Sequence, residues 1–322
     1  MEQRNLGPFG PVSALTLGGG GIGHLWGKTT REECLATVKA AVDGGITLLD
    51  MAPRYGDGEA ESVIGEAFGG RLPAGVRVTT KCLLGGTPPA EIEARLRSSI
   101  ATSLKLMKLE KIDLFFLHSN VAPDDHPMRG HPDAAVRVTP YSVFCEHVRP
   151  LFETFVAEGL IGAWGLTGIG QPDAIIRLLG ESPAPAAVQA ISNPIDSPGA
   201  LKFYDGPTRQ RDVIATAKAN GVGVLGIKAV QAGALSAQID RPLPDDHPEM
   251  LDYKRAGRWR TLAAEIGEDP ADLAHRYALT MDGVDTVVLG VKNRRELAMC
   301  LAAEARGPLD ADLVRRIDES FD

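Results

Sequence analysis

Four side chains with complementary acid–base chemistry stand at or just beyond the ends of three apolar runs. Asp50 follows ITLL, Lys81 follows VRVTT and His118 follows IDLFFL. Tyr55 lies five residues beyond Asp50. The ordinary pKa of tyrosine, about 10, is too high for efficient proton exchange at neutral pH, but a neighbouring ammonium lowers it. We therefore predict that Tyr55 exchanges a proton with a carbonyl oxygen, assisted by Lys81 and its partner Asp50, while His118 orients that oxygen.

Parallel strands are needed to bring these side chains together. Apolar runs of strand length recur along the chain, and most are followed by helical periodicity, which predicts a parallel sheet. We expect strands in SALTL, ITLL, VRVTT, IDLFFL, IGAWGL, AAVQAI, VGVLGI and TVVL. Eight such strands close naturally into an α/β fold, a single-domain (β/α)8 TIM barrel over residues 1–322. In such barrels the C-terminal ends of the strands form one mouth, which carries the active site.

The intervening helices are predicted from apolar periodicity and from their boundary residues. Thr29 and Thr30, with Glu32 and Glu33 three residues later, have the spacing of a capping box, and Gly44 ends the helix that they begin. Further helices are expected over residues 59–68, 89–106, 143–158, 172–180, 207–219 and 271–281.

Two loops are long enough to cover the mouth. The segment 119–141 follows the fourth strand and is rich in Pro, Asp and His, and the segment 236–248 is a second candidate. The first segment contains possible metal ligands at Asp124, Asp125, His126, His131 and Asp133. Because their spacing fits no fixed geometry on a helix or strand, we expect no metal site.

The run GGGGIG at residues 18–23 invites comparison with the glycine fingerprint of dinucleotide-binding Rossmann folds. That fingerprint requires its third glycine to open a helix whose N-terminus binds pyrophosphate. Here the predicted helix begins only at Thr29, so we reject the Rossmann interpretation. We expect instead a loop after the first strand, where the missing side chains of Gly19 and Gly20 let a flat group such as a nicotinamide ring approach the backbone.

The composition of the chain limits the kinds of binding partner that we expect. The formal net charge is -8 without a long single-sign run, which argues against nucleic acid or an anionic membrane as a partner. The 4 cysteines lack metal or disulfide spacing, which favours a reducing compartment. No apolar signal core and no stretch of about 18 apolar residues is present. We expect a cytoplasmic protein that acts on a small molecule; nothing in the composition indicates an oligomeric state.

These motifs resemble those of the aldo-keto reductase family. DMAPRYGDGEAESVIGEAF is similar to the family signature, and VTTKC and DLFFLHS are similar to its other two signature strands. LGPFGPVSALTLGGGGIG is similar to the family's N-terminal hairpin and first strand, and VVLGVKNRRELAMCLAA to its cofactor segment. The resemblance implies that Asp50, Tyr55, Lys81 and His118 match the catalytic tetrad. It also implies direct hydride transfer that reduces an aldehyde or ketone to an alcohol, or the reverse.

The same resemblance implies where NADPH binds. Thr167 and Gln189 match residues that hold the nicotinamide carboxamide, and Ile227 and Lys228 lie in the stretch that covers the ring and pyrophosphate. The residues expected along the adenosine phosphate are Gly290, Lys292, Asn293 and Arg294. The cations among them favour the 2′-phosphate of NADPH, whereas Glu296 in the same segment keeps NADH possible.

Substrate identity and reaction direction do not follow from the sequence. Trp26 and Tyr141 are candidate walls of an apolar substrate pocket. Two alternative functions stay open at this point. The protein could be a nucleotide-binding redox sensor or regulatory subunit with weak catalysis, or a Schiff-base aldolase that uses Lys228.

Overall fold

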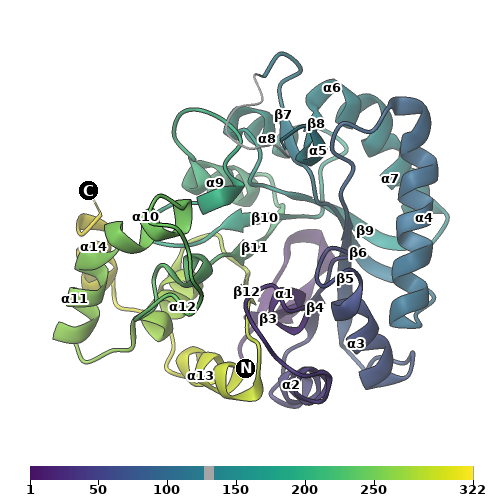
Figure 1. Ribbon diagram of the computed structural model, residues 1–322. Helices are drawn as coiled ribbons and strands as arrows, with labels where there is room; N and C mark the ends of the chain where they lie inside the picture. Colours follow the sequence, from purple (N-terminus) through teal and green to yellow (C-terminus); the bar gives the residue numbers. More distant parts are fainter. Residues whose placement is uncertain (127–133, 322) are drawn as a thin grey trace.

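The computed structural model describes residues 1–126 and 134–321, and its centre is a closed barrel of parallel strands surrounded by helices (Figure 1). The barrel strands are β3 (Leu15–Gly18), β4 (Leu48–Asp50), β5 (Arg77–Cys82), β6 (Ile112–Leu117), β9 (Ile161–Thr167), β10 (Ala187–Ile191), β11 (Gly223–Ile227) and β12 (Thr286–Leu289). Their order around the barrel follows the sequence, and β12 pairs with β3 to close it. The predicted (β/α)8 fold is confirmed, and the Rossmann interpretation is excluded.

Every predicted run contributes a barrel strand. The bounds of β6 and β12 agree with the apolar runs IDLFFL and TVVL. The strand β5 continues beyond the predicted VRVTT, so that Lys81 lies inside the strand rather than after it. Similarly, β9 extends to Thr167. Both extensions carry a polar side chain to the C-terminal rim.

Most helices on the outside of the barrel were predicted. They are α2 (Arg31–Asp43), α3 (Glu59–Phe68), α4 (Pro89–Met107), α8 (Pro172–Leu179), α9 (Gln210–Ala219) and α12 (Pro270–Thr280). The predicted helix over 143–158 consists of α6 (Tyr141–Val143), the π-helical turn η2 (Phe144–Val148) and α7 (Arg149–Ala157). Thr30 caps α2, because its hydroxyl accepts a hydrogen bond from the backbone N–H of Glu33 at 3.2 Å. Thr29 instead donates to the carbonyl of Lys292.

Several short elements had weaker signals or none. The N-terminal hairpin expected from the family resemblance is β1 (Gln3–Asn5) and β2 (Pro11–Ser13), joined by η1 (Gly7–Phe9). The glycine run, which was expected to be a loop, contains a single helical turn, α1 (Gly19–Ile22), directly after β3. The later elements outside the predicted ranges are η3 (Gly199–Leu201), η4 (Gln231–Gly233), α10 (Pro248–Arg255), α11 (Gly257–Glu265), α13 (Arg294–Ala305) and α14 (Ala311–Glu319).

The segment after β6 is partly structured. It contains β7 (Asn120–Ala122) and β8 (Val138–Pro140), which pair in parallel, and the short helix α5 (Ala134–Arg137). Of the candidate metal ligands in this segment, His131 and Asp133 lie outside the described residues. Within residues 1–126 and 134–321, no group of three or more His, Cys, Asp or Glu side chains is arranged to hold a metal ion.

Apolar side chains fill the N-terminal end of the barrel interior, and polar side chains occupy its C-terminal end. Leu48, Leu114 and Phe116 pack inside the barrel in one buried cluster. Leu6 and Val12 from the N-terminal hairpin belong to the same cluster and close the N-terminal end. Since side chains along a strand alternate between its two faces, Asp50 faces the same interior as Leu48, one layer closer to the mouth.

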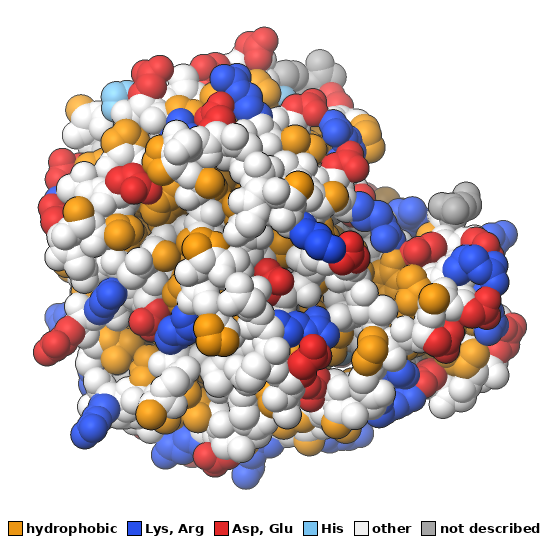
Figure 2. All heavy atoms as spheres, turned by 180° about the vertical axis from the view of Figure 1, so that it is seen from behind, with side chains coloured by type: hydrophobic (Ala, Val, Ile, Leu, Met, Phe, Trp, Pro, Cys, Tyr) orange, Lys and Arg blue, Asp and Glu red, His pale blue; other side chains and the backbone are white. Residues whose placement is uncertain are grey.

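On the face of the molecule opposite to that in Figure 1, neither acidic nor basic side chains dominate. Figure 2 shows acidic and basic side chains intermingled over that face, with small apolar areas between them. This distribution agrees with the absence of a long single-sign run in the sequence. Among the helices of the described chain, none combines the length and apolar character required to cross a lipid bilayer.

Candidate active site

The C-terminal ends of neighbouring strands bring the predicted tetrad together. Asp50 is the last residue of β4, Lys81 lies at the end of β5, and His118 directly follows β6. Strand pairing sets their relative heights, since Asp50 pairs with Thr79 and the backbone N–H of His118 donates to the carbonyl of Cys82 at 2.8 Å. Three side chains that are 31 to 68 residues apart in sequence therefore meet at one mouth.

A buried ion pair forms the floor of the site. The Lys81 ammonium donates to Asp50 Oδ1 at 2.8 Å and to the carbonyl of Met51 at 2.8 Å, and Lys81 is fully buried. Asp50 Oδ1 also accepts hydrogen bonds from Thr79 Oγ1 at 2.5 Å and Gln189 Nε2 at 2.9 Å. Burial by itself disfavours the charged lysine, but the adjacent carboxylate reverses this and raises the pKa of Lys81. The amine is therefore held as a cation.

Tyr55 lies over this ion pair. It sits in the turn between β4 and α3, whose backbone is fixed by bonds from Tyr55 N–H to the carbonyl of Ala52 at 3.0 Å and from Ala60 N–H to the carbonyl of Tyr55 at 3.1 Å. The Lys81 nitrogen is 5.0 Å from the centroid of the phenol ring. The ring of His118 meets it edge-on, with centroids 5.9 Å apart. The phenol thus contacts both the cation and the imidazole.

The acidity of Tyr55 differs from the sequence-based expectation. Burial raises the pKa of Tyr55 and outweighs the opposing effect of the Lys81 charge, so the net direction is upward rather than downward. The lysine acts in the expected sense, but it moderates the desolvation of the phenol and does not overcome it. Tyr55 therefore stays protonated throughout the neutral range, which suits a proton donor.

His118 is neutral at physiological pH. Burial lowers the pKa of its imidazole well below the ordinary 6.5, and the positive charges of Lys81, Arg54 and Arg137 lower it further. A neutral imidazole has one N–H donor, which can hold a carbonyl oxygen without adding another charge to the site.

Two polar side chains at the C-terminal rim, on β9 and β10, are those expected to hold a nicotinamide carboxamide. Thr167, at the end of β9, is buried, and its hydroxyl has no hydrogen-bond partner in the described chain. Gln189, on the neighbouring strand β10, donates through Nε2 to Asp50 at 2.9 Å. A buried hydroxyl without a partner is unfavourable, so Thr167 fits a bound polar group.

The glycines after β3 are required by contacts within the chain itself. A Cβ on Gly19 would lie 3.0 Å from the Tyr55 ring, and one on Gly20 would lie 2.7 Å from the indole nitrogen of Trp26. A Cβ on Gly290 would also approach that nitrogen, at 3.2 Å. The indole of Trp26 therefore lies over the ends of β3 and β12. Its ring also faces the guanidinium of Arg241, 5.9 Å from the ring centroid.

The cations expected along the adenosine phosphate already have carboxylate partners. Lys292 contacts Asp240 from the loop after β11 and lies 3.3 Å from Glu296. Arg294 donates to Glu33 of α2 through two side-chain nitrogens, at 3.1 and 2.9 Å, and these bonds lower the pKa of Glu33 to about 2. The side chain of Asn293 caps α13 by accepting from the backbone N–H of Glu296 at 2.9 Å.

Lys228, directly after β11, has a left-handed backbone and a buried amine. Ile227 ends β11, and Lys228 has a left-handed backbone with φ of 57°. The Lys228 amine donates to the carbonyl of Pro198 at 2.6 Å and lies 3.9 Å from Glu249. Burial lowers the pKa of Lys228 to about 8. Its contacts direct the amine toward the η3 and α10 segments.

The structure does not bring Tyr141 to the tetrad. Its hydroxyl contacts the carboxylate of Glu181, which follows α8, and its ring lies 4.5 Å from the guanidinium carbon of Arg177. These contacts anchor α6 to the outer helix layer. Polar partners on α8 and just beyond it hold the side chain, and its role in a substrate pocket stays a prediction.

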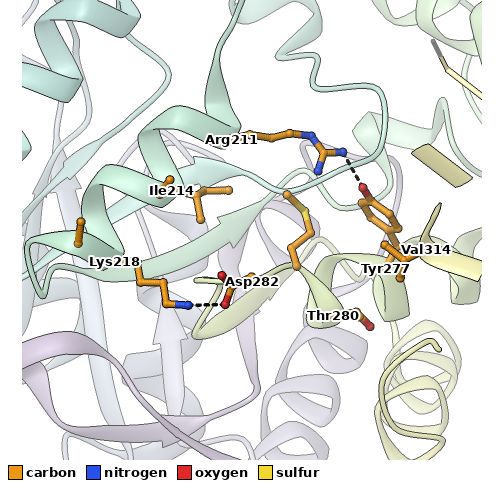
Figure 3. Close-up of a pocket in the computed structure, with 10 residues that line it drawn as sticks. Arg211, Ile214, Lys218, Tyr277, Thr280, Asp282 and Val314 are labelled. Atoms are coloured by element: carbon orange, nitrogen blue, oxygen red, sulfur yellow. Dashed lines mark hydrogen bonds and ion pairs between the residues drawn. The ribbon is translucent and has the colours of Figure 1, made fainter. Parts of the chain in front are cut away.

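A groove of about 590 Å³ lies on the outer wall of the barrel, away from these residues (Figure 3). Arg211 of α9 points toward Tyr277 of α12 and donates to its hydroxyl at 2.6 Å, and Lys218 pairs with Asp282. None of the four tetrad residues lines this groove. It is a gap between outer helices and not part of the site at the mouth.

Two residues at the mouth were missed at the level of sequence. Thr79 precedes Lys81 by two positions, so strand alternation could have placed it beside Asp50. Asp240 had no usable signal, because only the path of the loop after β11 brings it to Lys292.

Comparisons with known proteins agree with this geometry. The model of the family described as "Aldo/keto reductase family" matches residues 14–322. L-galactose dehydrogenase of Arabidopsis thaliana is 25% identical over 94% of this chain and 88% of its own length. An aldo-keto reductase of Bacillus halodurans in its holo form has a TM-score of 0.73 at 22% identity, covering 99% of this chain and 96% of that one. A Klebsiella pneumoniae aldo-keto reductase in complex with NADPH has a TM-score of 0.69 at 19% identity, covering 100% and 96%.

Proposed function

The chain belongs to the aldo-keto reductase family of NAD(P)H-dependent oxidoreductases, and we propose that it interconverts an aldehyde or ketone and its alcohol with NADPH as cofactor. One observation carries the proposal. The fully buried Lys81–Asp50 pair lies beneath Tyr55, and neutral His118 stands at the edge of the phenol ring. This arrangement can donate a proton to a carbonyl oxygen.

The proposed roles follow from charge and position. A bound reduced nicotinamide supplies the hydride. His118 donates a hydrogen bond that holds the carbonyl oxygen near the Tyr55 hydroxyl, and Tyr55 gives its proton to that oxygen as negative charge develops there. The Lys81 cation stabilises the phenolate that remains, and Asp50 keeps the lysine charged and in place. Alcohol oxidation uses the same residues in reverse.

Thr167 and Gln189 would hold the carboxamide and thereby orient the nicotinamide. The unpartnered hydroxyl of Thr167 supports this assignment. Gln189 bridges the cofactor position and the acid–base residues, since its amide already donates to Asp50. Ile227, Lys228, Gly290 and Asn293 would line the remaining path of the dinucleotide.

The pH dependence should reflect the direction of each pKa shift. Tyr55 must be protonated to act as an acid, and because burial raises its pKa it stays protonated throughout the neutral range. His118 stays neutral because its pKa lies well below 6.5. We therefore expect kcat/KM for reduction to be constant between about pH 6.5 and 9 and to fall only above that range. In oxidation kcat/KM should rise with pH as the phenolate forms. A reduction profile that loses half its value near pH 6.5 would contradict these assignments.

Cofactor preference should depend on Glu296. Its carboxylate lies 3.3 Å from the Lys292 ammonium, so it opposes a 2′-phosphate at that cation. Replacing Glu296 by Gln removes the charge and keeps the shape. We expect the ratio of Kd values to shift about tenfold toward NADPH over NADH, or ~1.4 kcal/mol. Fluorescence titration with each cofactor measures the ratio, with Glu110→Gln on the exposed surface as the matched control. An unchanged ratio of Kd values would mean that the 2′-phosphate of NADPH does not bind beside Glu296 and Lys292.

Turnover with a carbonyl panel tests the function as a whole. The enzyme is titrated with NADPH and NADH by fluorescence, and the preferred cofactor is then used with aldehydes and sugars. Oxidation of the cofactor by at least one carbonyl supports the proposal. Binding without oxidation across the panel would favour the redox-sensor alternative. The aldolase alternative predicts covalent borohydride trapping of a carbonyl on Lys228, whose amine instead contacts Pro198 and Glu249.

A further inference from the structure

The backbone directly after β11 is held in an unfavourable conformation. Lys228, Gln231 and Ala232 have left-handed φ angles of 57°, 45° and 49°. Such angles are costly for residues that carry a Cβ, and they persist only where the surrounding structure fixes them. The segment continues the strand that ends with Ile227 at the mouth. Its shape therefore decides what can lie along this part of the rim.

Two polar side chains of this segment reach into a largely buried polar cluster. The Lys228 amine donates to the carbonyl of Pro198 at 2.6 Å and lies 3.9 Å from Glu249 Oε1. The fully buried Gln231 donates through Nε2 to Asp252 Oδ2 at 2.7 Å. Both carboxylates belong to α10, so this helix holds the segment after β11 at two points.

The same carboxylates also contact the loop after β10. Asp252 Oδ2 accepts a second hydrogen bond, from Ser197 Oγ at 2.6 Å. A Cβ on Gly199 would lie 2.7 Å from Gln231 Nε2 and 3.0 Å from Glu249 Oε1, so the backbone there packs directly against both side chains. The loops after β10 and β11 are therefore joined to each other and to α10.

The charge of Lys228 is matched within this cluster. Burial lowers the pKa of Lys228 to about 8, whereas the charges of Glu249 and Asp252 act to raise it. At neutral pH the amine is therefore mostly protonated, and it is bound to the carbonyl of Pro198 beside these carboxylates. The contribution of Lys228 to cofactor binding then comes from its backbone position and not from its charge.

We propose that Glu249 and Asp252 of α10 are positioning residues for the cofactor. By holding the side chains of Lys228 and Gln231 they fix the left-handed backbone after β11 in the shape that binds the dinucleotide. The inference rests on the proposed function, in which this segment lies along NADPH. A loop that must be ordered on binding lowers affinity, whereas a preorganised loop avoids that loss. The two carboxylates therefore set cofactor affinity without taking part in the chemistry.

Positioning predicts a change in affinity opposite in sign to simple electrostatics. NADPH is an anion, so the loss of a nearby carboxylate would by charge alone strengthen binding. If Asp252 positions the segment, its loss weakens binding, because part of the population then has the wrong loop conformation. The sign of the change in Kd therefore separates positioning from charge repulsion.

Fluorescence titration with NADPH measures Kd in matched variants. We expect Asp252→Ala to raise Kd about tenfold, as it would if about one molecule in ten kept the competent loop. Asp252→Asn should restore most of the affinity, since its amide oxygen can still accept from Ser197 and Gln231. Asp246→Ala removes an exposed carboxylate two residues before α10 and is the control, with Kd as in the wild type. A partly unfolded preparation does not mimic the effect, because Kd is a property of the folded fraction.

The chemical step provides a second readout. At saturating NADPH we expect the single-turnover rate of cofactor oxidation in Asp252→Ala to stay within about twofold of the wild type, because only ground-state binding is affected. A fold that is damaged as a whole would lower this rate together with the affinity. An unchanged rate with a raised Kd is therefore specific to positioning.

Lys228→Met tests whether the amine itself binds a phosphate. Positioning predicts a higher Kd for NADPH with the same dependence on salt as in the wild type. Glu249→Ala, which removes the carboxylate beside the amine, should act in the same direction. A direct ion pair with phosphate would instead make the salt dependence of Kd weaker in Lys228→Met, because one screened contact is lost. That result would overturn the positioning role of Lys228.

The outcomes separate this inference from the proposed function. If the wild type binds neither NADPH nor NADH, or reduces no carbonyl of the panel, the proposed function fails. If the wild type is active but Asp252→Ala binds NADPH as tightly as the wild type or more tightly, carbonyl reduction stands and the positioning role is wrong. A lowered single-turnover rate with an unchanged Kd would also contradict positioning and leave the proposed function intact.

Discussion

Tyr55→Phe is expected to lower kcat by about 10²–10⁴-fold, because a positioned general acid contributes that much to proton transfer. The substitution removes one oxygen and keeps the ring, whose edge contact with His118 and position over Lys81 need no hydroxyl. Cofactor affinity should change little, because the substitution leaves intact Thr167 and Gln189, which we propose hold the nicotinamide carboxamide from β9 and β10. The measurement is kcat for carbonyl reduction together with a fluorescence titration of NADPH.

Tyr253→Phe is the matched control. The Tyr253 hydroxyl, on α10, donates to the carbonyl of Ala237 at the surface, so its loss should not affect proton transfer. If Tyr55→Phe kept the wild-type kcat, the Tyr55 hydroxyl could not be the proton donor. Equal losses in both tyrosine variants would indicate a general effect of the substitution on the fold.

Lys81→Met is expected to reduce both activity and stability. The ammonium makes two hydrogen bonds at 2.8 Å inside the barrel, and its removal leaves the Asp50 carboxylate buried without a counter-charge. Breaking a buried ion pair by removing one partner costs about 3–5 kcal/mol. Loss of the cation that stabilises the phenolate should lower kcat by at least about 10²-fold. Thermal unfolding and steady-state kinetics measure the two effects.

A double substitution separates the charge effect from packing. Lys81→Met with Asp50→Asn removes both charges, so it should be more stable than Lys81→Met alone, although it should remain inactive. Lys105→Met, on the exposed face of α4, is the control for the loss of a lysine. If the double variant were less stable than Lys81→Met, the unpaired carboxylate could not be the cause of the instability.

The barrel was predictable because its signals are local. Parallel strands that are buried on both faces are apolar almost throughout, so runs such as IDLFFL stand out from the amphipathic helices beside them. Their polar terminal residues, Asp50, Lys81 and His118, marked the mouth. The geometry of a barrel then required these side chains to converge, even though they are far apart in the sequence.

The features that were not predicted depend on long-range packing. The turn α1 forms where glycine is required by Tyr55, Trp26 and the chain after β12, and helix propensity alone argues against a helix of glycines. The contact between Tyr141 and Glu181 was not foreseen, because an aromatic residue near a predicted loop gives no sign of a distant carboxylate partner. The direction of the Tyr55 pKa shift likewise depends on burial, which the sequence does not reveal.

The segment expected along the adenosine phosphate illustrates the same limit. The family resemblance implied that Lys292 and Arg294 lie there, and their charge favoured a 2′-phosphate. In the structure Asp240 and Glu33, from distant parts of the chain, pair with these cations. If these cations do bind the cofactor phosphate as we propose, the balance between NADPH and NADH depends on ion pairs that only the folded chain creates.

A single-turnover experiment tests the central claim most directly. NADPH is bound to excess wild-type enzyme or Tyr55→Phe enzyme, a carbonyl substrate is added, and oxidation of the bound cofactor is followed by its absorbance. The account predicts that both proteins bind NADPH, that the wild type oxidises it in one rapid phase, and that the variant does so at least about 10²-fold more slowly. Oxidation at the same rate in both proteins would show that the proton does not come from Tyr55, and would contradict the account.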